Sequence, residues 1–552
     1  MTTATTPDAG MRGKGLILVT LCLAALIINL DTTIVNVALP ALVRQLGAAT
    51  TGLQWVVDAY NLVFAALVLA AGSLGDRLGR KGMLLAGLGV FGAASLAGSF
   101  AVSTGQLITA RAVMGLGAAM MFPATLSLLT NVFTERRERA LAIGVWGASA
   151  GVGIALGPIA GGWLLERFWW GAIFLFMVPV AALVAAMTAW WVPASRDPRT
   201  PPVDWRGLVL SAAGMGLVVY GIIQAPGWGW ASARTIGVLA AGAVALAVLV
   251  AAERRTASPM IDMSLFRNLR FTAASGSVAI AFFALLGFIF LMTQYLQVVH
   301  AYTPLSTGVR LLPVAASVGV ASTVGTRLAV PLGNKVIVGG GLALVCAALA
   351  WISTESQVTS YGIIAAQMVV FGIGMGMTQA PATEAIMGAV PKEKAGVASA
   401  VNGSTRLFGG TLGVAVIGSV AASVYTSQLT AGLHADLPAQ ALTAARGSVG
   451  GAAAAAQQLT RAGLAGTAHA LDDAAVSAFM HSFSGGCLVA AAVAAAGALL
   501  VAFLLPARPR ADLAVVSQTA GARPHAAAHH RQTAAANTPE AIVGASAEER
   551  RG

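Results

Sequence analysis

Residues 72–81 read Gly-Ser-Leu-Gly-Asp-Arg-Leu-Gly-Arg-Lys and carry four charged side chains, although only 10% of the 552 residues in the chain are charged. The sequence on either side is almost purely apolar. An apolar helix of about 20 residues is long enough to cross the hydrocarbon core of a bilayer. A short charged segment between two such stretches is therefore predicted to be a turn at a membrane surface.

The composition extends this interpretation to the whole chain, because 57% of the residues are hydrophobic and 64 are glycine. A backbone in lipid must satisfy its own hydrogen bonds, and strands of a barrel would be shorter and alternating, so the apolar segments are predicted to be helices. The sequence thus predicts an all-α polytopic membrane protein with fourteen spans. The predicted segments are 15–39, 52–71, 83–102, 106–130, 140–163, 170–192, 207–224, 235–252, 271–297, 308–329, 336–353, 360–385, 396–425 and 485–505.

The 33 lysine and arginine residues orient these spans. With the N-terminus in the cytoplasm, 25 of them fall in inner connections and tails, 6 fall in outer connections, and Arg111 and Arg406 lie within spans. Positive charge accumulates on the cytoplasmic side of membrane proteins. We therefore expect a multi-pass protein of the cytoplasmic membrane with both termini in the cytoplasm. The same bias accounts for the net charge of +12 without a nucleic-acid partner.

The turn at 72–81 contains more than orientation requires, since Arg80 and Lys81 alone would supply the positive charge. Its glycines allow a tight turn and a close approach of two helices. Asp76 beside Arg77 can form an ion pair that holds two helix ends together. The residues predicted to act in this turn are Gly72, Gly75, Asp76, Arg77, Gly79, Arg80 and Lys81.

This ten-residue pattern resembles the signature loop of the major facilitator superfamily, at its usual place between spans 2 and 3. The resemblance implies a cytoplasmic latch in which Asp76 and Arg77 pair with neighbouring helices. A second, degenerate copy at 325–335 lies between spans 10 and 11 but lacks the aspartate. It indicates an internal repeat if spans 7 and 8 are an insertion, and repeated halves around a central site are how such transporters alternate access.

The repeat and the polar connections predict a division of the chain into two six-helix bundles with two inserted helices between them. A solvated tail is expected at each end, and the second bundle is expected to include a long outer loop at 426–484. The predicted parts are a cytoplasmic N-tail at 1–14, the first bundle at 15–192, the inserted pair at 207–252, the second bundle at 271–505, and a disordered cytoplasmic tail at 507–552.

Span 5 carries a run of glycines with a proline among them. Such glycines make a smooth face for close helix packing, and Pro158 removes a backbone donor and bends the helix. A generic packing groove is one interpretation. The order G-x-x-x-G-P-x-x-G-G also resembles the antiporter motif of exporters in this superfamily, which implies efflux. Its residues are Gly153, Gly157, Pro158, Gly161 and Gly162.

Further segments are similar to the fourteen-span drug:proton antiporters of the superfamily. They are Leu30–Pro40, Trp55–Leu62, Ser258–Phe271, Ala395–Gly396 and Arg406–Gly410. This resemblance implies proton- or cation-binding roles for Asp31 and Asp58 and a proton-relay role for Arg111.

Five ionisable residues lie inside apolar segments, where they are costly to insert. They are Asp31, Asp58, Arg111, Glu384 and Arg406. Counting from the span ends places the first three at a similar depth in the outer half, where they would titrate as a coupled set. A carboxylate that takes a proton from one side and releases it to the other meets the requirement for proton coupling.

Other roles remain open for each of these residues. Asp31 could cap a helix or form a fixed structural pair with Arg111, and Asp58 could lie close to the outer interface. Either carboxylate could also attract a cationic substrate. Glu384 could face the cytoplasmic headgroups, pair with Arg406, or recognise substrate charge.

A set of methionine and phenylalanine side chains could line an adaptable apolar cavity, since Met-rich surfaces suit varied ligands. Ordinary packing is the more frequent role of such residues in spans. The set comprises Met114, Met120, Met121, Phe122, Phe371, Met375 and Met377.

Several classes of function lack support in the sequence. Cys22, Cys346 and Cys487 form no Cys-x-x-Cys pair, so neither a disulfide framework nor a zinc site is indicated. No nucleophile-base or metal cluster points to an enzyme, and no cofactor is implied. There is no Walker-type loop, which argues against ATP drive within this chain.

The sequence therefore predicts a monomeric, proton-coupled exporter of hydrophobic, often cationic, drugs or antibiotics. Its partners would be these small substrates, protons and membrane lipid. The alternatives are a proton- or cation-linked importer of a small metabolite and a lipid flippase. The span 5 motif argues against import.

Overall fold

The computed structural model describes residues 11–196, 204–256, 262–390, 395–433 and 437–506. Within these ranges the chain is helical and contains no strand. The α-helices are α1 (Met11–Leu46), α2 (Thr50–Leu78), α3 (Arg80–Ser99), α4 (Thr104–Val132), α5 (Arg136–Arg167), α6 (Ala172–Leu175), α7 (Met177–Trp191), α8 (Trp205–Trp228), α9 (Ala233–Glu253), α10 (Leu269–Gln294), α11 (Pro304–Arg310), α12 (Leu312–Leu332), α13 (Asn334–Ile352), α14 (Tyr361–Gly388), α15 (Ala395–Gly432), α16 (Ala439–Gly447), α17 (Val449–Arg461) and α18 (Ala465–Leu504).

Fourteen helical stretches in the described ranges are long and apolar enough to cross a membrane. Each of them overlaps one predicted segment, so the predicted fold class is confirmed. Helices α6 and α7 together make one span, and α11 and α12 make another. The break between α11 and α12 falls at Leu311, just before Pro313, whose ring removes a backbone donor.

Two helices run well beyond the apolar segments that predict them. Helix α15 continues to Gly432, and α18 begins at Ala465 rather than near residue 485. The extra turns of α18 are rich in alanine, which has the highest helix propensity. Water can solvate the polar groups of both extensions outside the bilayer. Hydropathy marks only the lipid-facing part of such helices.

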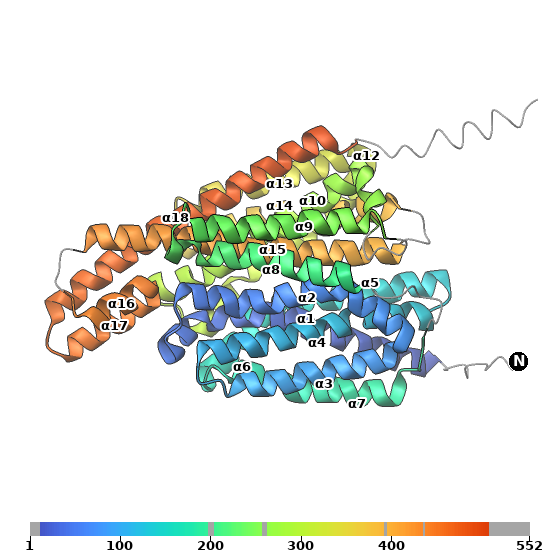
Figure 1. Ribbon diagram of the computed structural model, residues 1–552, viewed down its shortest axis with the longest axis horizontal. Coiled ribbons are helices and arrows are strands. Elements are labelled where there is room, and N and C mark those ends of the chain that lie inside the picture. Colours follow the sequence, from blue (N-terminus) through green and yellow to red (C-terminus); the bar gives the residue numbers. More distant parts are fainter. Residues whose placement is uncertain (1–10, 197–203, 257–261, 391–394, 434–436, 507–552) are drawn as a thin grey trace, which may run out of the picture. The chain divides into compact units, whose positions relative to one another are not determined.

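Contacts between the helices define a first group, α1–α7, and a second group, α10–α15 with α18 (Figure 1). In the first group α1 packs on α5, α2 on α4, and α3 on α4 and α7. In the second group α10 packs on α15, α12 on α14, and α13 on α14 and α18. The inserted pair α8 and α9 pack on each other, and α8 also contacts α2 and α15, which come from different groups.

Glycine contacts repeat between the two groups. A Cβ on Gly117 of α4 would lie 2.8 Å from the carbonyl oxygen of Gly87 on α3, and a Cβ on Gly374 of α14 would lie 2.7 Å from that of Gly341 on α13. Likewise, α5 approaches α1 through glycine, and α15 approaches α10 through Gly413. Matching close contacts between corresponding helices support the internal repeat indicated by the two loop copies.

The turn at 72–81 joins α2 to α3 through Gly79, whose φ of 127° favours glycine. Arg80 Nε donates to Asp76 Oδ1 at 2.6 Å, and Arg80 Nη1 donates to Ser195 Oγ at 3.1 Å. Lys81 Nζ donates to the Ala189 carbonyl oxygen at 2.8 Å. The charges thus tie α2 and α3 to the end of α7. Asp76 pairs with Arg80 rather than Arg77, which is exposed.

The second loop copy has the same backbone design. Gly333 lies between α12 and α13 with a φ of 84°. Asn334 Nδ2 donates to the carbonyl oxygen of Pro381 on α14 at 3.4 Å. A neutral hydrogen bond takes the place of the ion pair of the first copy, which fits the missing aspartate.

Helices α16 and α17 form a short hairpin within the predicted outer loop, beyond the ends of the spans (Figure 1). Tyr425 Oη at the end of α15 donates to the Ala445 carbonyl oxygen at 2.9 Å. Thr50 Oγ1 at the start of α2 donates to the Gly447 carbonyl oxygen at 2.9 Å. A Cβ on Gly450 would lie 3.0 Å from Val43 Cγ1 of α1. The hairpin therefore contacts both groups of spans.

Candidate functional site

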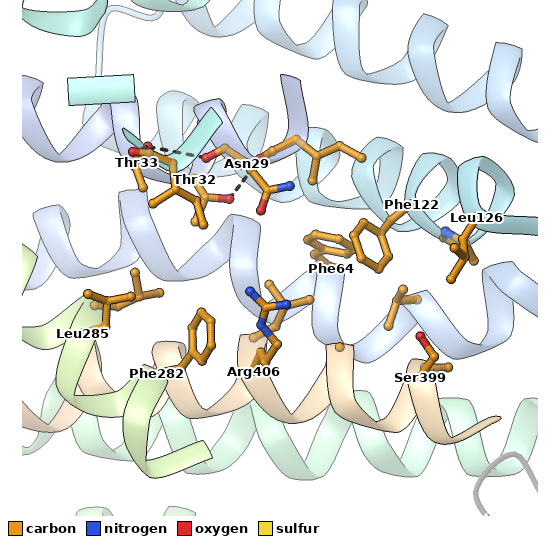
Figure 2. A pocket seen from close by; sticks show the side chains of 18 of the residues that line it. Asn29, Thr32, Thr33, Phe64, Phe122, Leu126, Phe282, Leu285, Ser399 and Arg406 are labelled. Atoms are coloured by element: carbon orange, nitrogen blue, oxygen red, sulfur yellow. Dashed lines mark hydrogen bonds between the residues drawn. The ribbon is translucent and has the colours of Figure 1, made fainter. Parts of the chain in front are cut away.

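A cavity of about 450 Å³ lies between the two groups of spans. Its walls come from α1, α2, α4 and α5 on one side and from α10, α14 and α15 on the other. Ligand pockets of small-molecule binding proteins have volumes of roughly 300–1,000 Å³. Figure 2 shows three phenylalanines on these walls, Phe64 and Phe122 from the first group and Phe282 from the second. Phe64 and Phe122 meet edge to face, with ring centroids 5.7 Å apart.

Most polar side chains in the described lining donate hydrogen bonds to backbone carbonyl oxygens. Asn29 Nδ2 donates to the Ala25 carbonyl oxygen at 2.8 Å, and Thr32 Oγ1 donates to that of Ile28 at 3.0 Å. Thr33 Oγ1 donates across to the Ile154 carbonyl oxygen on α5 at 3.1 Å. These residues were not among the predicted site residues. Their spacing of three and four residues in an otherwise apolar span places them on one helix face, and that pattern could have identified them.

Arg406 is the one charged residue in the described lining. It projects from α15 into the cavity beside Phe282 (Figure 2). Its guanidinium carbon lies 4.5 Å from the centroid of the Phe282 ring, a cation–π distance.

Asp31 and Arg111 form a wholly buried ion pair behind this wall, with Asp31 Oδ2 and Arg111 Nη1 2.6 Å apart. Arg111 Nε also donates to the Val56 carbonyl oxygen at 3.0 Å. The guanidinium carbon lies 4.4 Å from the ring centroid of Tyr60, whose hydroxyl donates to the Ile28 carbonyl oxygen at 3.2 Å. The pair thus joins α1, α2 and α4, and neither member lines the cavity.

Asp58 is also wholly buried but does not join this pair. Neither of its carboxylate oxygens has a hydrogen-bond partner among the described residues. One helical turn away, Gln54 Nε2 donates to the Ala415 carbonyl oxygen at 2.9 Å and to Ser419 Oγ at 3.1 Å on α15. Gln54 and Asp58 share a face of α2, so Asp58 lies near the contact between the two groups.

Glu384 is exposed and does not line the cavity. No ion pair between Glu384 and Arg406 occurs in the described part of the chain. Of the five predicted membrane charges, the structure therefore brings together Asp31 and Arg111 and leaves the other three apart.

The glycines of the span 5 motif pack on two different helices. A Cβ on Gly153 would lie 2.7 Å from the Leu26 carbonyl oxygen, and one on Gly157 would overlap Thr33 Oγ1 of α1. A Cβ on Gly162 would lie 2.5 Å from the Pro304 carbonyl oxygen at the start of α11. A Cβ on Gly161 would lie 2.8 Å from Ile34 Cγ1, and Pro158 meets Gly308 of α11. The motif thus packs α5 on α1 within the first group and on α11 of the second group.

The two ends of the cavity differ. At the end distant from the turn 72–81, α5 packs on α11. There Gln297 Nε2 donates to the Val37 carbonyl oxygen at 2.9 Å, and the Leu305 amide donates to Glu166 Oε1 at 3.3 Å. The lining residues of α4 and α14 lie toward the opposite end, which carries the turn 72–81. Several contacts between the two groups therefore seal the cavity at the end distant from the turn 72–81.

Two pseudo-repeated groups of helices around a central cavity define a helical membrane transporter. A profile of the Major Facilitator Superfamily matches residues 21–414. The chain belongs to this superfamily, which confirms the identification made from its loop motif.

Named relatives of the chain are resistance and efflux proteins. It is 36% identical to the multidrug efflux pump LfrA of Mycolicibacterium smegmatis, over 88% of this chain and 95% of that protein. It is 34% identical to the methyl viologen resistance protein SmvA of Salmonella typhimurium, over 89% and 97%. It is also 34% identical to the tetracenomycin C resistance and export protein of Streptomyces glaucescens, over 76% and 78%.

A solved structure with the same fold is a bacterial homologue of the human lysosomal transporter Spinster in an inward-facing, occupied conformation. The match has a TM-score of 0.64 at 15% sequence identity and covers 89% of this chain and 97% of that chain.

Proposed function

We propose that this protein is a proton-coupled antiporter that exports hydrophobic drugs or antibiotics across the cytoplasmic membrane. The observation that carries the proposal is the central cavity, whose aromatic and aliphatic walls come from both groups of spans. Such a lining binds varied apolar molecules without demanding one shape. The relatives described above, which are efflux and resistance proteins, support the same class of substrate.

In this proposal both termini lie in the cytoplasm, as the distribution of lysine and arginine predicts. The cavity then extends toward the cytoplasm, and the sealed end faces outward. This is the arrangement of a state that accepts substrate from the cell. Export requires a second state in which α5 separates from α11 and the inner ends of the helices close.

The span 5 motif contributes to this exchange of states. Its glycines allow α5 to pack closely on α1 and α11 with few interlocking side chains. Small residues permit close contact that can also be separated without moving large side chains through one another. We propose that this smooth face is the outer seal that opens for release.

Proton coupling in this proposal rests on Asp31 and Asp58, with Arg111 as the partner of Asp31. An ionised carboxylate that is buried without a partner is very costly, so Asp58 would be neutral while the outer end is sealed. Separation of α2 from α15 would expose it to water and allow it to ionise. Protonation of Asp31 would leave the buried Arg111 without its counterion and so alter the stability of this state.

Inverted membrane vesicles with an acidic interior provide a direct test. A panel of hydrophobic drugs and dyes is added while a pH-sensitive dye reports the interior pH. We expect substrate-triggered alkalinisation in the wild type and its loss in Asp31→Asn or Asp58→Asn. Asp473→Asn, on an exposed position of α18 outside the cavity, is the matched control and should retain the response.

The outcomes separate the parts of the proposal. Alkalinisation that persists in Asp31→Asn and disappears in Asp58→Asn assigns the proton to Asp58. Substrate accumulation against an intact gradient without proton movement would contradict proton coupling. Uptake of substrate into whole cells, driven by the same gradient, would replace export by import.

A further inference from the structure

We propose that Arg406 is the substrate-recognition group of the central cavity, and that the cavity favours aromatic compounds bearing an anionic group over cationic ones. This inference rests on the proposed export function, because it assigns the cavity to the transported molecule. It narrows the substrate class that the sequence predicts, which includes cations.

The first support is the state of the Arg406 side chain. A guanidinium carries five N–H donors in a planar fork. In the described part of the chain none of these donors makes a hydrogen bond to a protein acceptor. The Arg406 guanidinium instead makes a cation–π contact with the Phe282 ring. The guanidinium nitrogens of Arg406 lie at the cavity, beside the Phe282 ring (Figure 2).

The second support is the absence of a counterion nearby. The described lining contains no aspartate, glutamate or histidine. Asp31 lies behind the wall and is already paired with Arg111 at 2.6 Å. Glu384 is exposed and does not line the cavity. Arg406 is therefore the one charged side chain that a substrate meets on the described wall of the cavity.

A half-buried cation that no protein acceptor among the described residues pairs with favours a ligand that supplies a counterion. Guanidinium binds carboxylate, sulfonate or phosphate oxygens through two parallel charge-assisted hydrogen bonds, which are stronger than neutral ones. Folding has already removed Arg406 from bulk water, and the free energy of the folded protein includes that desolvation penalty. A ligand that binds Arg406 therefore gains the electrostatic attraction without a second desolvation of the guanidinium. A cationic ligand finds the opposite field and no carboxylate to offset it.

The aromatic part of the proposal comes from the opposite wall. Phe64 and Phe122 lie edge to face across the space that Arg406 enters, and Trp146 supports Phe122 with ring centroids 5.4 Å apart. These rings are held by one another and present a preformed apolar surface. A flat ring system would lie against Phe64 and Phe122 with its acidic group directed to Arg406.

Two dyes with the same ring system test the charge dependence. They are 8-anilinonaphthalene-1-sulfonate and its neutral analogue N-phenyl-1-naphthylamine. Binding to the full chain in nanodiscs of zwitterionic lipid is followed by energy transfer from the protein's tryptophans, with empty nanodiscs subtracted. We expect the sulfonate to bind at least about tenfold more tightly than the neutral dye, the size of one charge-assisted hydrogen bond.

The variants separate charge recognition from packing. Arg406→Gln should abolish the tighter binding of the sulfonate and leave the affinity for the neutral dye within about threefold of wild type. Arg406→Lys keeps the positive charge but not the planar fork, so it should retain part of the preference for the sulfonate. Arg327→Gln, at an exposed position outside the cavity, should behave as wild type. The hydrophobic cation tetraphenylphosphonium should displace the neutral dye more effectively from Arg406→Gln than from wild type.

Three results would overturn the proposal. The wild type could bind the sulfonate no more tightly than the neutral dye. Arg406→Gln could retain the preference for the sulfonate, or it could lose affinity for both dyes equally. The export function is judged separately, by dye transport in energised vesicles. Charge-dependent binding without any transport would overturn export and retain the recognition site. Transport that ignores both dye charge and Arg406 would retain export and overturn the recognition site.

Discussion

Arg111 and Arg406 are both arginines within membrane spans, one in each group of helices, and their surroundings are opposite. Arg111 has a carboxylate, a backbone carbonyl and an aromatic face as partners and is wholly buried. Arg406 has one aromatic face and opens onto the cavity. The first arginine holds three helices together, whereas the second is available to a ligand.

This difference shows that the cost of a buried charge can be met in two ways. The protein itself compensates Arg111, so its removal should damage the fold. In our proposal the substrate compensates Arg406, so its removal should alter binding more than stability. The unfolding free energies of variants at Arg111 and at Arg406 can therefore separate these two roles.

The largest expected effect is that of Arg111→Gln. The change leaves Asp31 buried without its counterion, and breaking a buried pair in this way typically costs about 3–5 kcal/mol. Thermal unfolding of the purified protein in detergent, together with the yield of folded protein, measures the loss. The double variant Asp31→Leu/Arg111→Met removes both charges and should recover much of the lost stability. A double variant less stable than Arg111→Gln would contradict the account of the pair.

The next effect concerns the helix contact that positions Asp31. In Gly157→Ala the new methyl group overlaps Thr33 Oγ1 and lies 2.9 Å from the Leu30 carbonyl oxygen. Overpacking of this kind costs about 1–3 kcal/mol. Gly151→Ala, on the same helix with open space around its Cβ, is the control and should be neutral or slightly stabilising. Equal unfolding temperatures for the two variants would show that α5 does not pack on α1 as described.

A smaller effect is expected at Glu355, a largely buried carboxylate in the connection between α13 and α14. The Tyr295 hydroxyl lies 3.1 Å from Glu355 Oε2. Burial raises the pKa of Glu355 above its ordinary value of 4.5, although hydrogen bonds from Thr359 and Tyr295 oppose the shift. The folded protein then binds this proton more tightly than the unfolded chain, so stability is lost as pH rises from 4.5 through the folded-state pKa.

Unfolding temperatures measured across this pH range test that assignment. Glu355→Gln keeps the shape of the side chain and removes its titration. Its stability relative to wild type should therefore increase with pH. A constant difference at all pH values would exclude Glu355 as the source of the dependence.

The smallest expected effect on stability is that of Arg406→Gln. No protein hydrogen bond or ion pair to Arg406 is broken among the described residues. The lost contact with the Phe282 ring, worth about 0.5–1 kcal/mol, is offset by removal of a charge that has no counterion in the described lining, so the unfolding free energy should change by about 1 kcal/mol or less. The same thermal unfolding experiment compares it directly with Arg111→Gln. A loss comparable with that of Arg111→Gln would remove the distinction between the two arginines.

The features predicted well from the sequence are those that local chemistry determines. Hydropathy locates the spans because lipid imposes its requirement on every residue of a segment. The shared depth of Asp31 and Arg111, which permits their pairing, follows from the rise of about 1.5 Å per residue along each helix. The turn at 72–81 is also local, because Gly79 adopts the positive φ and Asp76 pairs with Arg80 four residues away.

The features that the sequence leaves open depend on how each helix is rotated against its neighbours. Asp58 has a depth similar to Asp31 but does not join its pair, and Glu384 faces outward instead of toward Arg406. Of the seven methionine and phenylalanine residues considered, Phe122 lines the cavity, while others such as Met114 and Phe371 are packed inside. Helix rotation results from tertiary packing, which no single segment encodes.

The hairpin of α16 and α17 has a consequence for inhibition. It is connected by sequence to the second group of spans, yet Gly447 and Gly450 rest on the start of α2 and on α1 of the first group. Any movement that separates the groups at this end must break those contacts. A binder that bridges the hairpin and the α1–α2 turn would therefore hold the protein in one state without entering the cavity. In the proposed orientation, with both termini in the cytoplasm, it would reach this surface from outside the cell.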